Sequence, residues 1–195
     1  DAVISANSYS VREEVLLFDR IDLYVSGNFD IPSRAKALSI SRVGTPFDGR
    51  ICEGIIYRLK KIPSAPVKYP YLTVSESVDV LTADLLTIRD FRKLKERLKK
   101  KVKQGTGLEV TVTPVRRMDA SAVGKWFDCV NELYLFCHSS RCQFILSSGA
   151  RSAYEMVSGR CFDAMLKTVG VDPQSHWHNM GEWLEAKLSK RVSYA

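Results

Sequence analysis

The alternation of strand and helix patterns along these 195 residues predicts an α/β fold built on a parallel sheet. Short apolar or alternating runs, typical of strands, are separated by stretches whose apolar residues recur at helical spacing. Parallel neighbours need long crossover connections, which helices supply. The number of strand patterns in a chain of this length favours a compact TIM-like (β/α) barrel, with an open sheet as the alternative. We expect one barrel-like domain over residues 1–195.

The expected elements follow one another without an internal repeat. The strand patterns are apolar or alternating runs that end at turn residues; they cover residues 2–6, 21–25, 37–43, 71–74, 78–81, 108–115 and 144–146. The helical patterns have apolar residues three and four positions apart; they start at Ser10 and then cover residues 50–61, 89–104, 120–136, 161–169 and 177–188. This rhythm of strand and helix is typical of a parallel sheet.

The composition favours a soluble intracellular protein that binds a polyanion. Hydrophobic residues make up 45% of the chain, enough for a core, and the net charge is +7. A basic balance raises the odds of a nucleic-acid partner, because Lys and Arg neutralise phosphates. We find no apolar run of membrane-spanning length and no secretory leader, so we expect no membrane contact.

Residues for autonomous catalysis or metal binding are sparse. The five cysteines, which include no Cys-x-x-Cys, are interpreted as free thiols; they are Cys52, Cys129, Cys137, Cys142 and Cys161. The three histidines are His138, His176 and His178, and the last two fall between helical patterns without a nearby third ligand. No Ser-His-Asp order, phosphate-binding P-loop or dinucleotide fingerprint is present. We therefore expect no catalytic residue, no metal ligand and no cofactor.

The strongest charge feature is the helical pattern over residues 89–104. Its apolar positions share one face, and the remaining positions are mostly cationic, with only Asp90 and Glu96 acidic. Such a face could lie along a phosphate backbone. The candidate phosphate contacts in this helix are Arg89, Arg92, Lys93, Lys99, Lys100 and Lys103. The alternative is an outer helix with a solvated basic face.

Further candidates follow the ends of two predicted strands, where functional loops of barrels gather. Arg116 and Arg117 come after the strand pattern 108–115, and paired guanidinium groups suit phosphates. The turn Ser-Ser-Gly-Ala at 147–150 follows the last strand, so amides at Ser148 and Gly149 could bind an anion. Arg151 and Arg160 flank that turn. The alternatives are surface arginines after a strand and an internal salt bridge of Arg160 with Glu155 or Asp163.

The aromatic residues are interpreted as core. Trp126, Phe127, Tyr134, Phe136, Trp177 and Trp183 lie at helical spacing among other apolar residues. Stacking on single-stranded bases would need exposed aromatic side chains interleaved with basic ones. The sequence shows no such pattern.

The last quarter of the chain carries a resemblance to a known family. The turn Ser-Ser-Gly-Ala at 147–150 is followed by Ser-x-Arg-x-Phe at 158–162, a glycine, and a last helix that ends Leu-Ser-Lys-Arg at 188–191. In this order the residues resemble the C-terminal region of ribonuclease P protein subunit 30, a TIM-barrel-like subunit found in archaea and eukaryotes. The family has a helix where residues 75–77 leave no room for one, so the barrel is expected to be open or irregular on that side.

The resemblance implies a non-catalytic, RNA-binding subunit of ribonuclease P, the ribonucleoprotein that removes 5′ leaders from precursor tRNA. In that family the RNA cleaves the phosphodiester with its own bound Mg²⁺. The expected partners are therefore the ribonuclease P RNA, precursor tRNA through the complex, and a small α+β protein subunit of the Pop-five type. The short chain favours an archaeal, cytoplasmic protein; a eukaryotic one would be nuclear or nucleolar and could also serve the related rRNA-processing particle.

Two alternatives remain from the sequence. A metal-dependent barrel hydrolase of the PHP or amidohydrolase type would act on phosphoesters, but it needs histidine-rich strand ends that this chain lacks. A scaffold protein with incidental basicity is the other.

Overall fold

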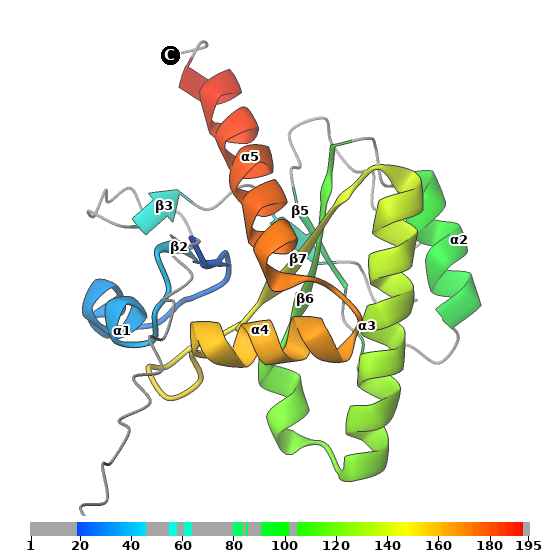
Figure 1. Ribbon diagram of the computed structural model, residues 1–195, viewed down its shortest axis with the longest axis horizontal. Coiled ribbons are helices and arrows are strands. Elements are labelled where there is room, and N and C mark those ends of the chain that lie inside the picture. The colour runs from blue at the N-terminus through cyan, green and yellow to red at the C-terminus, as the bar shows by residue number, and fades with distance from the viewer. Residues whose placement is uncertain are drawn as a thin grey trace, which may run out of the picture.

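The fold is mixed α/β, with parallel strands and helices alternating along the chain (Figure 1). In the computed structural model the described residues are 19–45, 55–57, 61–63, 80–83, 85, 91–101 and 105–192. These ranges contain seven strands and five α-helices. Within them, no helix is long and apolar enough to cross a membrane.

The strands form two parallel sheets. The first has the order β1-β2-β3, with β1 Ile21–Asp22, β2 Arg42–Thr45 and β3 Ile55–Tyr57. The second has the order β4-β5-β6-β7, with β4 Lys61–Pro63, β5 Val80–Ala83, β6 Gly107–Thr111 and β7 Gln143–Ser147. A parallel bridge between Val25 and Ala150 joins the first sheet to the end of β7. No pairing joins β3 to β4 within the described ranges, so the strands are not seen to close into a barrel there.

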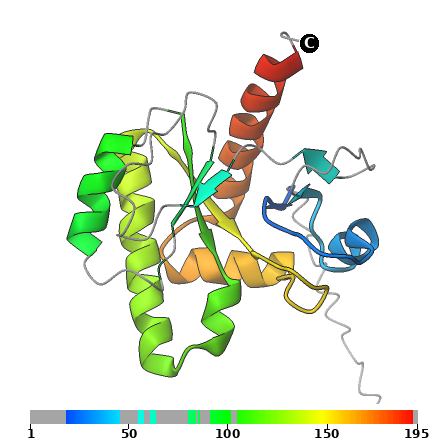
Figure 2. The same ribbon diagram turned by 180° about the vertical axis from the view of Figure 1, so that it is seen from behind.

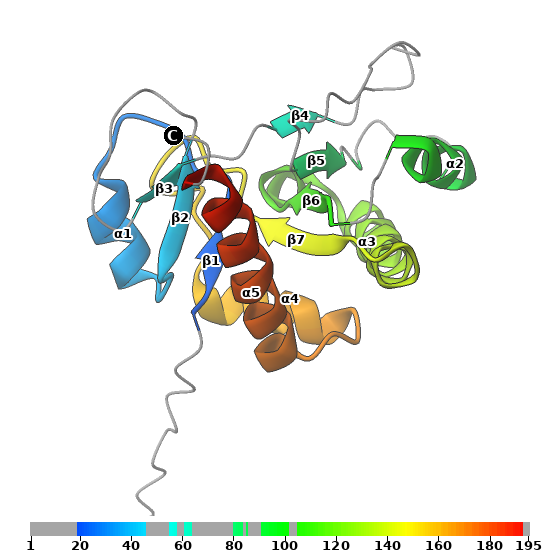
Figure 3. The ribbon, with the colours of Figure 1, turned by 90° about the horizontal axis from the view of Figure 1, so that it is seen from above.

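The helices surround the strands. Their bounds are α1 Ile31–Ala37, α2 Phe91–Lys101, α3 Ala120–Ser140, α4 Gly159–Thr168 and α5 Pro173–Val192, and a 3₁₀ helix, η1, covers Thr113–Arg117. Helices α3 and α5 pack against β7, and α2 packs against α3. Figures 2 and 3 show α2 and α3 side by side at the outer flank of the second sheet.

Local signals explain where α3 begins and ends. The Asp119 carboxylate accepts the amide hydrogen bond of Ala122 at 2.8 Å, which caps the first turn. At the other end Arg141 takes the left-handed conformation, with φ of 52°. The Cys142 amide then donates to the Cys137 carbonyl at 3.0 Å, the long-range bond of a Schellman motif. The chain therefore turns directly from α3 into β7.

The core lies between the strands and helices α3, α4 and α5. Phe162 and Trp177 are among its largest fully buried side chains, and their rings meet edge to face. The indole Nε1 of Trp177 donates to Asp163 at 2.8 Å, and Asp163 also pairs with Arg20 at 2.8 Å. These contacts join α4, α5 and the segment that precedes β1.

Most expected elements of the second half are confirmed, namely the strands at 80–83, 107–111 and 143–147 and the helices at 91–101, 120–140, 159–168 and 173–192. The strand predicted over 108–115 is wrong in its last part, because β6 ends at Thr111 and the 3₁₀ helix η1 begins at Thr113. The helix predicted over 50–61 is wrong, because the described parts of that stretch are strands β3 and β4. Its β-branched isoleucines favour extended backbone, and three-residue strands are too short to show alternation.

The strand predicted over 37–43 is also wrong in its first part. Helix α1 ends at Ala37, and only β2, from Arg42, is extended. Asp30 accepts from the Ser33 amide at 3.1 Å and is followed by a proline in the first turn, a helix-start signal that the alternation after it obscured. The elements predicted at 2–6, from Ser10 and at 71–74, and the short link 75–77, lie outside the described residues.

Candidate functional site

Two segments that leave the carboxyl edge of the second sheet lie against each other. One is η1, after β6; the other is residues 151–157, after β7, which we name the Tyr154 loop. The Arg116 guanidinium donates to the carbonyl oxygens of Tyr154 and, at 3.3 Å, Met156. From the other side, Arg34 of α1 donates from Nε to the Ala153 carbonyl at 3.1 Å. Arg116, predicted to contact phosphate, therefore uses its guanidinium to hold the Tyr154 loop.

Two backbone amides of the Ser-Ser-Gly-Ala turn at 147–150 are hydrogen-bonded to residues in or just after β1. The buried Ser148 donates its amide to the Asp22 carboxylate at 3.0 Å. Ala150 donates its amide to the Tyr24 carbonyl at 3.1 Å. Gly149 has a φ of 69°, and a Cβ there would lie 2.8 Å from the Thr111 Cβ. Because the amides of Ser148 and Ala150 already have protein acceptors, the turn has fewer free amides for an anion than the sequence predicted.

A buried polar network lies beneath this edge. The Glu109 carboxylate accepts from the Thr82 hydroxyl at 2.9 Å and from the Ser147 hydroxyl at 2.8 Å. Asp22 is fully buried, and its Oδ2 atom has no hydrogen-bond partner. Burial raises the pKa of Asp22 to about 6, against hydrogen bonds from Ser148 that lower it, and the Glu109 charge adds a smaller rise.

Sequence reasoning missed both carboxylates. The available signal was an acidic residue inside an apolar run, since Asp22 stands between Ile21 and Leu23 and Glu109 between Leu108 and Val110. The described residues contain no group of three or more His, Cys, Asp or Glu side chains arranged to hold a metal ion. The network joins strands β1, β5, β6 and β7 across the sheets, which gives it a structural role.

Exposed arginines lie at this edge. Arg117 ends η1, Arg151 opens the Tyr154 loop, and Arg160 lies in the first turn of α4; all three are exposed. Within the described part of the chain, no hydrogen bond or ion pair engages the guanidinium groups of Arg117 and Arg151. Glu155 accepts from the Arg151 amide at 2.7 Å, and Asp163 pairs with Arg20 at 2.8 Å. Three predicted candidates therefore come together around one loop.

Helix α2 forms a second basic region. Arg92 and Lys99 are exposed, but Lys99 lies 3.4 Å from Glu96, and Lys95 is paired with Glu132 of α3 at 2.8 Å. Because α2 connects two parallel strands, it runs opposite to them. Its first turn, with Arg92, therefore lies towards the carboxyl edge, and Lys99 lies towards the amino edge. Arg89 and Lys103 lie outside the described residues, as do the side chains of Lys93 and Lys100.

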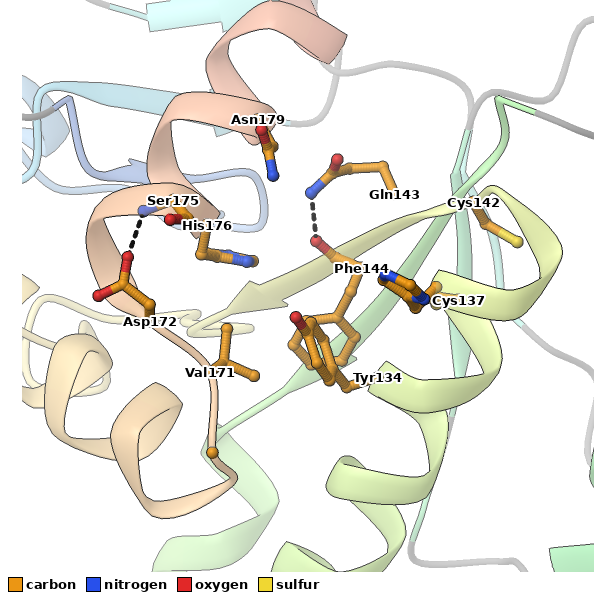
Figure 4. A pocket seen from close by; sticks show the side chains of 12 residues that line it. Tyr134, Cys137, Cys142, Gln143, Phe144, Val171, Asp172, Ser175, His176 and Asn179 are labelled. Atoms are coloured by element: carbon orange, nitrogen blue, oxygen red, sulfur yellow. Dashed lines mark hydrogen bonds between the residues drawn. The ribbon is translucent and has the colours of Figure 1, made fainter.

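A cavity of about 390 Å³ opens at the amino end of β7. Figure 4 shows it between α3, β7 and α5, with the side chains of His176, Asn179 and Tyr134 around it. Burial lowers the pKa of His176 to about 4, so its ring is neutral at pH 7, and its Nε2 atom has no partner. Among the residues that the structure describes, no lysine or arginine lines this cavity. A phosphate group would find no fixed positive charge on the described lining residues of this cavity.

The cysteines at this end of the sheet are free, as the sequence predicted for those that the structure describes. Cys137 is buried and Cys142 is half-buried; the Schellman motif brings them together. A hydrogen bond between the two sulfurs, together with burial, raises the pKa of the Cys137 thiol. The same hydrogen bond lowers the pKa of the Cys142 thiol, against a rise from its partial burial. His176 and His178 lie within α5, not between helices as the sequence suggested.

Comparisons of this chain with models of protein families, with curated proteins and with solved structures found no match. The resemblance to ribonuclease P protein subunit 30 therefore stays a prediction from the residues of the C-terminal quarter. The structure adds observations that do not depend on this resemblance. At the carboxyl edge, exposed guanidinium groups lie beside a loop whose backbone is fixed by hydrogen bonds.

Proposed function

We propose that this chain is a non-catalytic protein subunit of ribonuclease P that binds and stabilises the catalytic RNA for 5′ maturation of precursor tRNA. The observation that carries the proposal is the gathering of arginines at the carboxyl edge. Arg117 and Arg151 expose guanidinium groups that nothing in the described part of the chain engages, and Arg160 lies nearby. A planar guanidinium group can donate two parallel hydrogen bonds to the oxygens of one phosphate. Neutralising phosphates also releases the cations condensed on the RNA, which favours binding.

The order of the strands supports the proposed fold. From β3 the neighbours run through β2 and β1, cross the Val25–Ala150 bridge to β7, and continue through β6 and β5 to β4. Neighbours in space are thus neighbours in sequence, apart from the step from β1 to β7, which is the step that closes a ring. This is the order of a compact TIM-like (β/α) barrel, open between β3 and β4 within the described ranges. In such a fold, functional loops gather at the carboxyl ends of the strands, where these arginines lie.

The role needs no catalytic group from the protein. In the proposed particle the RNA holds the Mg²⁺ ions and cleaves the phosphodiester. Folding that RNA brings phosphates close together, and their repulsion opposes the fold. A rigid domain that holds arginines at fixed positions offsets this repulsion and lowers the Mg²⁺ concentration at which the RNA folds. A small α+β partner subunit would share this task.

The experiment is cleavage of precursor tRNA by the ribonuclease P RNA of the source organism at low Mg²⁺. Reactions contain the RNA alone, the RNA with the small partner, and the RNA with both proteins. We expect this chain to raise the cleavage rate in an RNA-dependent way. The double variant Arg117→Ala/Arg151→Ala should stimulate less, whereas Lys167→Ala, at the far end of α4, should behave as the wild type.

Two results would contradict the proposal. Cleavage by the protein without RNA would make it an enzyme in its own right, as the hydrolase alternative requires. No stimulation by the wild type, with an RNA and partner shown to be active together, would remove the subunit assignment and leave a basic α/β domain with another task.

A further inference from the structure

The side chain of Tyr154 stands out at the arginine-rich edge. It is 85% exposed, and Tyr154 and Leu135 are the large apolar residues that the described part of the chain leaves most open to solvent. A single exposed aromatic side chain is common on protein surfaces. Tyr154 differs from such residues because hydrogen bonds fix its backbone and because arginines lie in and beside its loop.

The backbone on both sides of Tyr154 is fixed. Arg116 donates to the carbonyl of Tyr154 itself, and Arg34 donates to the carbonyl of the preceding residue, Ala153. Inside the loop, the Glu155 carboxylate accepts from the Arg151 amide at 2.7 Å, and the Glu155 amide donates to the Ser152 carbonyl at 3.1 Å. The loop then enters the core through two buried residues, Met156 and Val157.

A ring that is exposed on a fixed backbone is preorganised for binding. A tyrosine has few side-chain torsions to order, so a partner that stacks on it loses little freedom once the loop is already set. Two arginines, Arg34 and Arg116, are used to hold a loop that buries little of its own surface at Tyr154. The exposed ring, not the loop, is the feature that this arrangement presents to solvent.

The cationic residues in and beside the Tyr154 loop outnumber its one carboxylate. Arg151 opens the same loop, Arg117 follows the residue that binds the Tyr154 carbonyl, and Arg160 lies in the first turn of α4. The acidic residue of the loop, Glu155, is turned to the Arg151 amide. An exposed aromatic ring among guanidinium groups is the combination that binds single-stranded nucleic acid, since the ring stacks on a base while the cations contact its phosphates.

We propose that Tyr154 is a stacking platform for an unpaired RNA base, with Arg151 and Arg117 on the flanking phosphates. The proposal rests on the RNA-binding function above and specifies the RNA element, a bulge, loop or single-stranded end. A continuous duplex does not offer this contact, because its bases are stacked on one another.

The test measures the affinity of the full chain for a 12-nucleotide single-stranded RNA and for the duplex of the same sequence. The variants are Tyr154→Ala, Tyr154→Phe and Tyr154→Trp, with Leu135→Ala on α3 as the control for losing an exposed apolar side chain. We expect Tyr154→Ala to weaken single-strand binding by roughly 5- to 150-fold. Tyr154→Phe, Tyr154→Trp and Leu135→Ala should bind it as the wild type does, and duplex binding should change in none of them.

A spectroscopic readout tests stacking directly. A 2-aminopurine base placed in the single strand should lose fluorescence on binding the wild type and Tyr154→Phe, and keep it with Tyr154→Ala. If the wild type binds no RNA, the proposed function fails, and the platform fails with it. If the wild type binds RNA and Tyr154→Ala binds the single strand equally well, the platform alone is overturned. If Tyr154→Ala instead weakens only the binding of the small partner subunit, the ring is a protein contact and the proposal is also overturned.

Discussion

Removing the charge of Asp22 should change how the stability of the protein depends on pH. Asp22 is fully buried between β1 and the turn after β7, and burial raises the pKa of its carboxyl to about 6. The folded state therefore binds this proton more tightly than the unfolded state does. The resulting stabilisation is fully present below the unfolded pKa and is lost as the pH rises through the folded pKa.

The magnitude follows from the pKa difference. A rise in the pKa from 3.8 to about 6 corresponds to about 3 kcal/mol in the free energy of unfolding, of which about 2 kcal/mol is lost between pH 4 and pH 7. The variant Asp22→Asn retains a side-chain oxygen that can accept the Ser148 amide, but it does not titrate. Placing an amide nitrogen at the position of the unpartnered Oδ2 adds a cost that is the same at every pH.

The assay is urea unfolding of the wild type and Asp22→Asn at several pH values from 4 to 7. Other titrating groups are common to both proteins, so the difference between their free energies of unfolding isolates Asp22. We expect that difference to move by about 2 kcal/mol in favour of the variant from pH 4 to pH 7. A difference that stays constant across this range would refute the reasoning, because Asp22 would then titrate alike in the folded and unfolded states.

Two further predictions concern packing and thiol reactivity. A Cβ at Gly159 would lie 2.2 Å from the Arg20 Cδ and 2.7 Å from the Ser39 carbonyl oxygen, so Gly159→Ala should lower the free energy of unfolding by roughly 1–3 kcal/mol. At Gly181 on α5 an added Cβ would meet open space, so Gly181→Ala should instead raise the free energy of unfolding by roughly 0.5–1 kcal/mol. Urea unfolding of the two glycine variants measures both changes, and equal changes would contradict the prediction. In the folded protein, iodoacetamide should modify Cys142 before the buried Cys137, as peptide mass spectrometry would show; the reverse order would be inconsistent with the direction of their hydrogen bond.

The second half of the fold could be predicted because its local signals agree with its packing. Phe144, Ile145 and Leu146 form a continuous apolar run, as strands buried on both faces do, and all three are buried in β7. Asp119 and Ser158 are cap residues that start α3 and α4. By contrast, Ile55 and Ile56 matched one face of a helix, and only pairing with β2 makes them a strand.

The candidate site was predicted less well, because its contacts depend on the pairing of β6 with β7. That pairing puts Arg116 against the carbonyl of Tyr154, which lies far along the chain, and no local pattern distinguishes an arginine that binds carbonyls from one that binds phosphate. Likewise, no local pattern distinguishes Tyr154 from the aromatic residues of the core. Its exposure follows from a loop whose ends are fixed by Arg34 and Arg116.

The central claim is that arginines at the carboxyl edge contact RNA phosphates. The most direct measurement is the affinity of the full chain for the ribonuclease P RNA at several salt concentrations, for the wild type and for Arg117→Ala, Arg151→Ala and Lys167→Ala, each of which removes one positive charge. We expect the slope of log affinity against log salt to fall in magnitude by roughly 0.7–0.9 for each of the two arginine variants and to stay unchanged for Lys167→Ala. Equal slopes in all four proteins would contradict the account.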